Sequence, residues 1–124
     1  MWISRRFGDV VAGYGEIWSA RLLAALIGKL APGRGGTWID ARQVITVHQT
    51  ELGPTVLWEQ SRRNFGDVVP ADFAGIAVMT GFIATDETGL QTTLGRNGSD
   101  YSAAIFAALS SACELSIWTD VDGV

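Results

Sequence analysis

The residues best suited to chemistry lie together in the stretch TTLGRNGSD, residues 92–100. Arg96 carries a planar guanidinium that matches a carboxylate or a phosphate, and Gly98 allows a ligand to approach the backbone closely. Ser99 and Asp100 are expected to open a helix, whose free N–H groups attract an anion. Two interpretations stay open: an anion site, or a turn in which Ser99 caps the helix and Asp100 complements its dipole. The stretch matches neither a Walker loop nor the GxGxxG fingerprint.

Other polar side chains also have a structural and a functional interpretation. Asp120 and Asp122, in TDVDG, either form an Asp-Gly turn or present oxygen atoms to a polar ligand at the edge of a sheet. Glu16, at a helix start, either complements the helix dipole or binds an ammonium group. His48 stands alone in an expected loop, so a general acid or base role is not favoured. Cys113 is expected to pack in a helix as a small hydrophobic residue.

Composition limits the class of protein. The 124 residues suit one domain, and the 48% that are hydrophobic supply a core. A formal charge of −4, from 13 acidic and 9 basic residues, argues against a nucleic-acid partner. One cysteine and one histidine cannot form an internal disulfide or a zinc-type cluster, so no metal site is predicted. Neither a signal peptide nor a run of about 18 apolar residues is found, so we expect a cytoplasmic protein without a membrane partner.

The apolar pattern predicts six elements that must position these side chains. Helices are expected at residues 15–30, 56–64 and 100–113, and strands within residues 37–47, 75–85 and 115–120. The stripe of the first helix that should face the core consists of Ala20, Leu23, Leu26, Ile27 and Leu30. An exposed turn is expected at Gly53 and Pro54. Alternating helices and apolar strands indicate an α/β domain with a largely parallel sheet, in which ligands bind at the carboxyl ends of strands.

A near-repeat stands near the start of the chain. The segment SRRFGDVV at residues 4–11 returns as SRRNFGDVV at residues 61–69. Two copies are too few for a repeat architecture. The repeat is therefore due to chance, or it indicates that the first dozen residues are foreign to the domain.

Four blocks of the chain resemble the aspartate kinases of the amino-acid kinase family. They read GYGEIWSARLLAA, WIDAR, VMTGFIATDETGLQTTLGRNGSDYSAAIFAAL and IWTDVDGV, and their order and spacing match from Gly13 onward. The resemblance implies a three-layer αβα amino-acid kinase domain with a largely parallel central sheet. It also implies ATP-dependent phosphorylation of the side-chain carboxylate of L-aspartate to 4-phospho-L-aspartate, the first step towards lysine, threonine and methionine. The sequence is similar to the kinase part of bifunctional enzymes, fused to homoserine dehydrogenase or to diaminopimelate decarboxylase.

The resemblance also implies a set of site residues. They are the catalytic candidate Asp100, the substrate-binding Glu16, Arg96, Gly98 and Ser99, and the nucleotide-binding Thr119 and Asp120. Glu16 would contact the ammonium group of aspartate, and Arg96 would bind one of its carboxylates. Asp100 would border the substrate and help to orient the groups that bind phosphate. ATP would be the co-substrate with Mg²⁺, and the full-length enzyme would be a homo-oligomer.

Two features of the resembled family have no counterpart here. No Lys-Phe-Gly-Gly stretch, whose lysine would face the transferred phosphate, precedes Glu16, and Lys29 is the only lysine. The tyrosine and the Asp-Pro-Arg stretch expected after TDVDGV are also not found. We therefore expect residues 1–12 to be an unplaced segment and residues 13–124 to be a partial catalytic domain, lacking both ends and inactive alone. The alternatives are a kinase for another small acid, such as glutamate or N-acetylglutamate, and a non-catalytic domain with a ligand-binding or assembly role.

Overall fold

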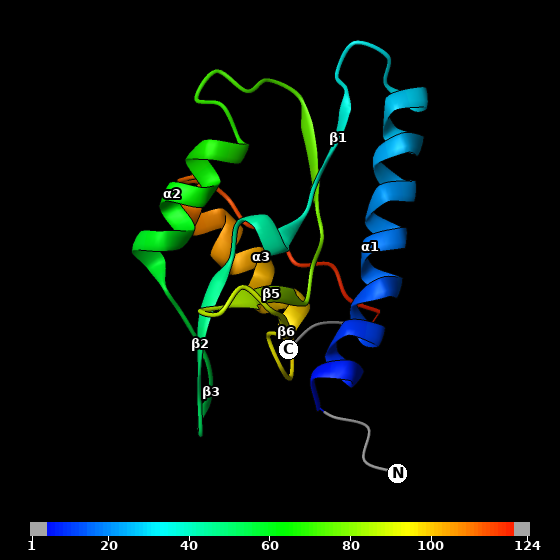
Figure 1. The fold of residues 1–124 in the computed structure, drawn as a ribbon. Helices are drawn as coiled ribbons and strands as arrows, with labels where there is room; N and C mark the ends of the chain where they lie inside the picture. The colour runs from blue at the N-terminus through cyan, green and yellow to red at the C-terminus, as the bar shows by residue number, and fades with distance from the viewer. Residues whose placement is uncertain (1–4, 121–124) are drawn as a thin grey trace.

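The computed structural model describes residues 5–120, so Asp122 lies outside the described residues. In chain order the elements are α1 (Arg5–Leu30), β1 (Gly36–Ile39), the 3-10 helix η1 (Ala41–Gln43), β2 (Thr46–Thr50), β3 (Gly53–Val56), α2 (Trp58–Val68), β4 (Ile76–Met79), β5 (Ile83–Asp86), β6 (Gln91–Thr93) and α3 (Gly98–Leu109). Helix α1 lies on one side of the strands, and α2 and α3 lie on the other (Figure 1). The α/β class and its three layers, predicted from the sequence, are confirmed.

The strands form two hydrogen-bonded groups. β1 pairs in parallel with β4, with Gly36 opposite Ile76. The other four strands stand in the order β3-β2-β5-β6, in which the β2–β5 pair is parallel and the β2–β3 and β5–β6 pairs are antiparallel. The parallel pairs agree with the predicted class, whereas the two hairpins were not anticipated. The turn of the first hairpin lies at Glu51 and Leu52, directly before the predicted Gly53 and Pro54.

Helix α1 begins at Arg5, ten residues before the predicted start. Three glycines in its first half lower helix propensity, which is why the local pattern placed the start too late. Its buried face also differs from the predicted stripe: Ile17, Ala20 and Ala24 are buried, whereas Leu23, Leu26 and Leu30 are exposed. The reason is close approach to β1, because a Cβ atom on Gly36 would overlap the carbonyl oxygen of Ala24. At this close approach Ala20 and Ala24 face the strands, whereas the large side chains of Leu23, Leu26 and Leu30 face outward.

The outer face of α1 also bears on the expectation that no segment could cross a membrane. By length and composition alone, Phe7–Leu30 is long and apolar enough to do so, which the sequence analysis did not foresee. A mostly buried core helix and a signal sequence pass the same test; α1 packs against β1, β4 and β6, and 22% of its apolar window is buried.

The apolar run at residues 75–85 is two strands instead of the predicted one. β4 ends at Met79 and β5 begins at Ile83, and the chain passes between them from the β1 pair to the four-stranded group. Phe82, with a φ of 70°, turns the backbone at this point. A left-handed bulky residue is rare and depends on its tertiary surroundings, so local composition does not predict the break.

Three predictions about the later elements need correction. Helix α2 spans Trp58–Val68 instead of residues 56–64, because Val56 belongs to β3. Helix α3 ends at Leu109, so Cys113 is exposed beyond it and does not pack in a helix. Residues 115–120 form no strand, and 94% of Trp118 is exposed. An apolar run becomes a strand only when a neighbouring strand pairs with it, which residue types alone do not specify.

Candidate functional site

The stretch singled out in the sequence runs from the end of β6 through a short loop into the first turn of α3, and its exposed residues are Arg96, Asn97, Ser99 and Asp100. Asn97 takes the left-handed conformation (φ 57°), and Gly98 is the first residue of α3. Gly98 is buried: a Cβ atom there would lie 2.7 Å from the ring of Phe82 and 3.2 Å from Leu94. The backbone N–H of Gly98 donates to the carbonyl of Gly95 (3.1 Å), which closes the turn. Glycine is therefore required here for close packing, which also seats the helix start on Phe82.

Ser99 is not the cap of α3, contrary to the prediction. The cap position belongs to Asn97, which makes no side-chain capping bond. Because the left-handed Asn97 lets the helix start at Gly98, Ser99 lies within the first turn and is exposed. Its backbone carbonyl accepts a hydrogen bond from the Ser102 hydroxyl (2.8 Å), and none of the described hydrogen bonds uses the Ser99 hydroxyl. That hydroxyl is thus open to a ligand.

A hollow of about 270 Å³ adjoins the first turn of α3. Its lining consists of Ala77, Met79, Gly81, Ser99, Ser102, Ala103 and Phe106. Gly81 faces α3 closely, since an added Cβ atom would lie 3.3 Å from the Ser102 hydroxyl, and that hydroxyl accepts from the backbone N–H of Phe82 (3.3 Å). Gly81 and Phe82 belong to one of the blocks that resemble aspartate kinases, but no role was predicted for them. The signal was the glycine followed by an aromatic residue inside an otherwise apolar run.

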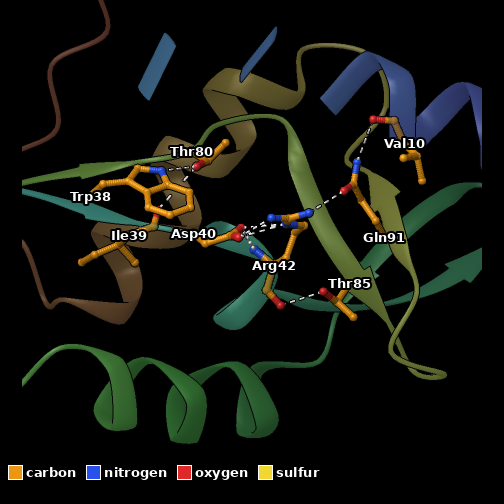
Figure 2. A network of polar contacts seen from close by, with 8 residues as sticks. All are labelled: Val10, Trp38, Ile39, Asp40, Arg42, Thr80, Thr85 and Gln91. Carbon is orange, nitrogen blue, oxygen red and sulfur yellow. Dashed lines mark hydrogen bonds and ion pairs between the residues drawn. The ribbon is translucent and has the colours of Figure 1, made fainter. Parts of the chain in front are cut away.

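The tip of β1 holds the backbone before this hollow in place. Trp38 donates from its indole nitrogen to the hydroxyl of Thr80 (2.9 Å), and the backbone N–H of Thr80 donates to the carbonyl of Ile39 (3.1 Å). Thr80 is fully buried and directly precedes Gly81. Figure 2 shows the contact between Trp38 and Thr80 beside the ion pair of Asp40 and Arg42. The end of β1 therefore fixes the segment that supports the start of α3.

A second polar network joins η1, β6 and α1 (Figure 2). Asp40, only 7% exposed, accepts from Arg42 Nε (2.9 and 3.0 Å) and Nη2 (2.5 Å). Arg42 Nη1 donates to Gln91 Oε1 (3.0 Å), and Gln91 Nε2 donates to the carbonyls of Asp9 (3.0 Å) and Val10 (3.4 Å). The hydrogen bonds that Arg42 donates to Asp40 raise the pKa of Arg42, against the opposing effect of burial, so the guanidinium stays charged. Asp40 and Arg42 belong to the block WIDAR, which resembles aspartate kinases, and neither was predicted to be a site residue.

The predicted site residues fall into three places. Arg96, Gly98, Ser99 and Asp100 lie together on the loop and first turn of α3, as predicted, with all but Gly98 exposed. Glu16 is half-buried on α1, one turn after Gly13, and no described hydrogen bond or ion pair joins it to Arg96. The predicted nucleotide-binding residues lie in the exposed segment after α3; they are Thr119 and Asp120.

The expectation for His48 also needs correction. It lies in β2, not in a loop, and its Nδ1 atom contacts the carboxylate of Glu87, which follows β5. The two side chains are about half exposed. Their meeting depends on the parallel pairing of β2 with β5, so it could not be read from the sequence.

Side chains that bind metal ions do not cluster in the part of the chain that the structure describes. Among residues 5–120, no group of three or more His, Cys, Asp or Glu side chains is placed to hold a metal ion.

Three layers of helices and strands, with a loop that carries Arg96 and two glycines before the start of α3, define an α/β domain. The amino acid kinase family model matches residues 2–124, and the chain belongs to that family.

Relatives and solved structures agree with this assignment. The chain is 44% identical over 121 residues to bifunctional aspartokinase/homoserine dehydrogenase 1, chloroplastic, of Arabidopsis thaliana, covering 95% of this chain and 13% of that protein. It is 37% identical over 114 residues to bifunctional aspartokinase/homoserine dehydrogenase 2 of Escherichia coli, covering 92% and 14%. A crystal structure of E. coli aspartokinase III in complex with aspartate and ADP superposes with a TM-score of 0.84 at 29% identity, covering 97% of this chain and 27% of that one. The chain thus spans about one-seventh of the length of the bifunctional relatives.

Proposed function

We propose that this chain supplies the substrate-binding part of an aspartate kinase, which transfers the γ-phosphoryl group of ATP to the side-chain carboxylate of L-aspartate. One observation carries the proposal: Arg96, Ser99 and Asp100 are presented together on an exposed turn in a chain similar to a kinase crystallised with aspartate and ADP. Phosphoryl transfer requires mainly positioning and charge stabilisation, which such a turn can provide. The product would be 4-phospho-L-aspartate.

Each side chain has a distinct part in this proposal. The guanidinium of Arg96 would bind a carboxylate of aspartate through two parallel hydrogen bonds. The free hydroxyl of Ser99 and the positive end of the α3 dipole would favour the same negative charge. Asp100 would orient the groups around the acceptor carboxylate. Gly98, which has no side chain, would let the ligand approach the backbone closely. Glu16 would pair with the ammonium group and so select an amino acid over a simple acid.

The nucleotide forms the second half of the proposal. Thr119 and Asp120 would lie near the adenosine of ATP, and Mg²⁺ would enter with the triphosphate. The bound ion would neutralise part of the phosphate charge. Beside the bound ion, Arg96 and Ser99 would hold a carboxylate of aspartate, and Glu16 would hold its ammonium group.

Binding of aspartate to the chain tests the proposal by isothermal titration. Arg96→Ala removes a charge-assisted hydrogen-bond pair worth about 1.5–3 kcal/mol, so affinity should fall about 10- to 150-fold. Arg62→Ala, an exposed arginine on α2, is the matched control and should bind like wild type. Absence of binding, or equal binding by wild type and Arg96→Ala, would reject the proposal.

The substrate alternative is addressed by the same titration. Glutamate is longer by one methylene and N-acetylglutamate lacks the ammonium group that Glu16 would bind. We expect aspartate to bind more tightly than either acid. Tighter binding of glutamate or N-acetylglutamate would assign the chain to a kinase for that acid instead. The non-catalytic alternative would show aspartate binding but no ADP formation once the chain is placed in a full-length enzyme.

Compartment and assembly belong to the same proposal. We infer a cytoplasmic enzyme, with a plastid as the alternative that the chloroplastic plant relatives offer. The full-length enzyme is inferred to be a homo-oligomer, which sedimentation analysis would measure directly.

A further inference from the structure

Gln91 is the residue at which three parts of the molecule meet. Its carboxamide oxygen accepts from Arg42 on η1, and its nitrogen donates to the carbonyls of Asp9 and Val10 on α1. Gln91 itself begins β6, the strand that leads directly into the loop with Arg96. The side chain is therefore a physical link between the helix that carries Glu16 and the strand that carries the anion-binding loop.

The link requires an amide at position 91. The amide combines an acceptor for the guanidinium with a donor for the helix carbonyls, whereas a carboxylate offers acceptors only. Glutamate would keep the contact with Arg42 but would set a negative charge against two carbonyl oxygens. The charged guanidinium, held in turn by the buried Asp40, anchors the amide in one orientation.

The surface of α1 is shaped to receive this amide. A Cβ atom on Gly13 would overlap Gln91 Nε2 and would lie 3.1 Å from Ile83. The amide thus lies flat on the helix at Gly13. Glu16 follows three residues later, and residues three apart share one face of a helix. The contact point and the proposed ammonium ligand are therefore one turn apart on the same side of α1.

We propose that Gln91 is a positioning residue that sets the spacing between Glu16 on α1 and Arg96 beyond β6. Through that spacing it determines the preference for a ligand with both an ammonium group and a carboxylate over a dicarboxylate without the ammonium. The inference rests on the proposed function, because it takes Glu16 and Arg96 as the groups that contact aspartate. Gln91 itself touches no substrate.

The test compares aspartate with succinate, which has the same two carboxylates and no ammonium group. Dissociation constants are measured for wild type, Gln91→Glu and the control Gln60→Glu, which makes the same chemical change on the exposed face of α2. In Gln91→Glu the ratio of the succinate to the aspartate constant should fall about 5- to 10-fold towards unity, with succinate binding changed less than about 2-fold. Gln60→Glu should keep the wild-type ratio.

The outcomes separate this inference from a merely structural role and from the proposed function. Equal weakening of both ligands in Gln91→Glu would overturn the inference, because general destabilisation does not discriminate between them. A wild-type protein that binds both acids equally would overturn the proposed role of Glu16 and this inference together. Wild-type preference for aspartate that survives in Gln91→Glu would overturn the inference alone.

A second variant and a second measurement keep the test valid if Gln91→Glu folds poorly. Gly13→Ala leaves Gln91 unchanged but displaces its amide from the helix, so it should lower the same ratio. Hydrogen exchange of the ligand-free Gln91→Glu protein should accelerate both in residues 10–20 of α1 and in the loop at residues 94–98. The β2–β3 hairpin should exchange as in wild type. Exchange unchanged at both of the linked segments would overturn the link itself.

Discussion

Replacing Gly13 by alanine should destabilise the protein, although the same change elsewhere in α1 should stabilise it. Glycine in a helix interior costs about 0.5–1 kcal/mol relative to alanine. An added Cβ atom would meet nothing within 4 Å at Gly8 or at Gly15, so Gly8→Ala and Gly15→Ala should gain that amount. At Gly13 the added methyl group would occupy the position of the Gln91 amide.

The expected size of the Gly13 effect follows from the bonds that the amide would lose. Gln91 accepts one bond from Arg42 and donates one good bond to the carbonyl of Asp9, at 3.0 Å each. Each contributes about 0.5–1.5 kcal/mol, so displacing the amide costs about 1–3 kcal/mol. Subtracting the gain in helix propensity leaves Gly13→Ala about 1 kcal/mol less stable than wild type.

Urea unfolding, followed by tryptophan fluorescence, measures all three glycine variants on one scale. We expect Gly8→Ala and Gly15→Ala to have a higher free energy of unfolding than wild type, and Gly13→Ala to have a lower one. If Gly13→Ala is stabilised as much as the other two, the amide of Gln91 does not lie on the helix and the proposed link is wrong. A change in the urea dependence itself would indicate an altered unfolded or native state instead of a local contact.

Other substitutions test the network, the loop and the surface. Arg42→Lys replaces the planar fork by a single ammonium group that cannot bond its carboxylate and the Gln91 amide together, so stability in urea should fall by about 1–3 kcal/mol; a value within error of wild type would show that the fork is not needed. Gly98→Ala forces a methyl group against the ring of Phe82 and should cost about 1–3 kcal/mol while weakening aspartate binding; an unchanged melting temperature and titration would contradict this. His48→Ala should change stability by less than about 1 kcal/mol, because the pair with Glu87 is half exposed; a larger loss in urea would indicate a structural role for the pair.

The sequence predicted local features better than contacts between distant segments. The turn at Gly95–Gly98 and the presence of a helix after it were predicted, although not the bounds of that helix, because glycine, arginine and a helix-forming run stand next to one another in the chain. The cap was misassigned to Ser99 because the left-handed conformation of Asn97 lets the helix start two residues earlier, at Gly98. The partner of His48 was missed because Glu87 lies 39 residues away, in the turn after β5.

The errors in α1 and in the later strands have the same origin. Large apolar side chains predicted the buried face of α1, but close approach to Gly36 selects small residues instead. The break at Phe82 depends on Gly98 and Leu94 packing against that ring and backbone. Residues 115–120 have the composition of a strand and yet form none. Pairing and packing between separate segments decided each of these cases, and neither is recorded in the local pattern.

The segment from Trp38 to Arg42 explains how a site made of separate elements keeps one geometry. Trp38 is bonded to Thr80 and thereby supports Gly81 beneath the first turn of α3. Four residues later, Arg42 is bonded to Gln91 and thereby supports β6 and α1. These two bonds reach the two sides of the proposed site, the helix start with its anion-binding loop and the helix with the ammonium ligand. Because one short segment contacts both α1 and the support of α3, a shift of this segment would move the two helices together. The distance between the ammonium ligand and the anion-binding loop, on which recognition of aspartate depends, would then stay the same.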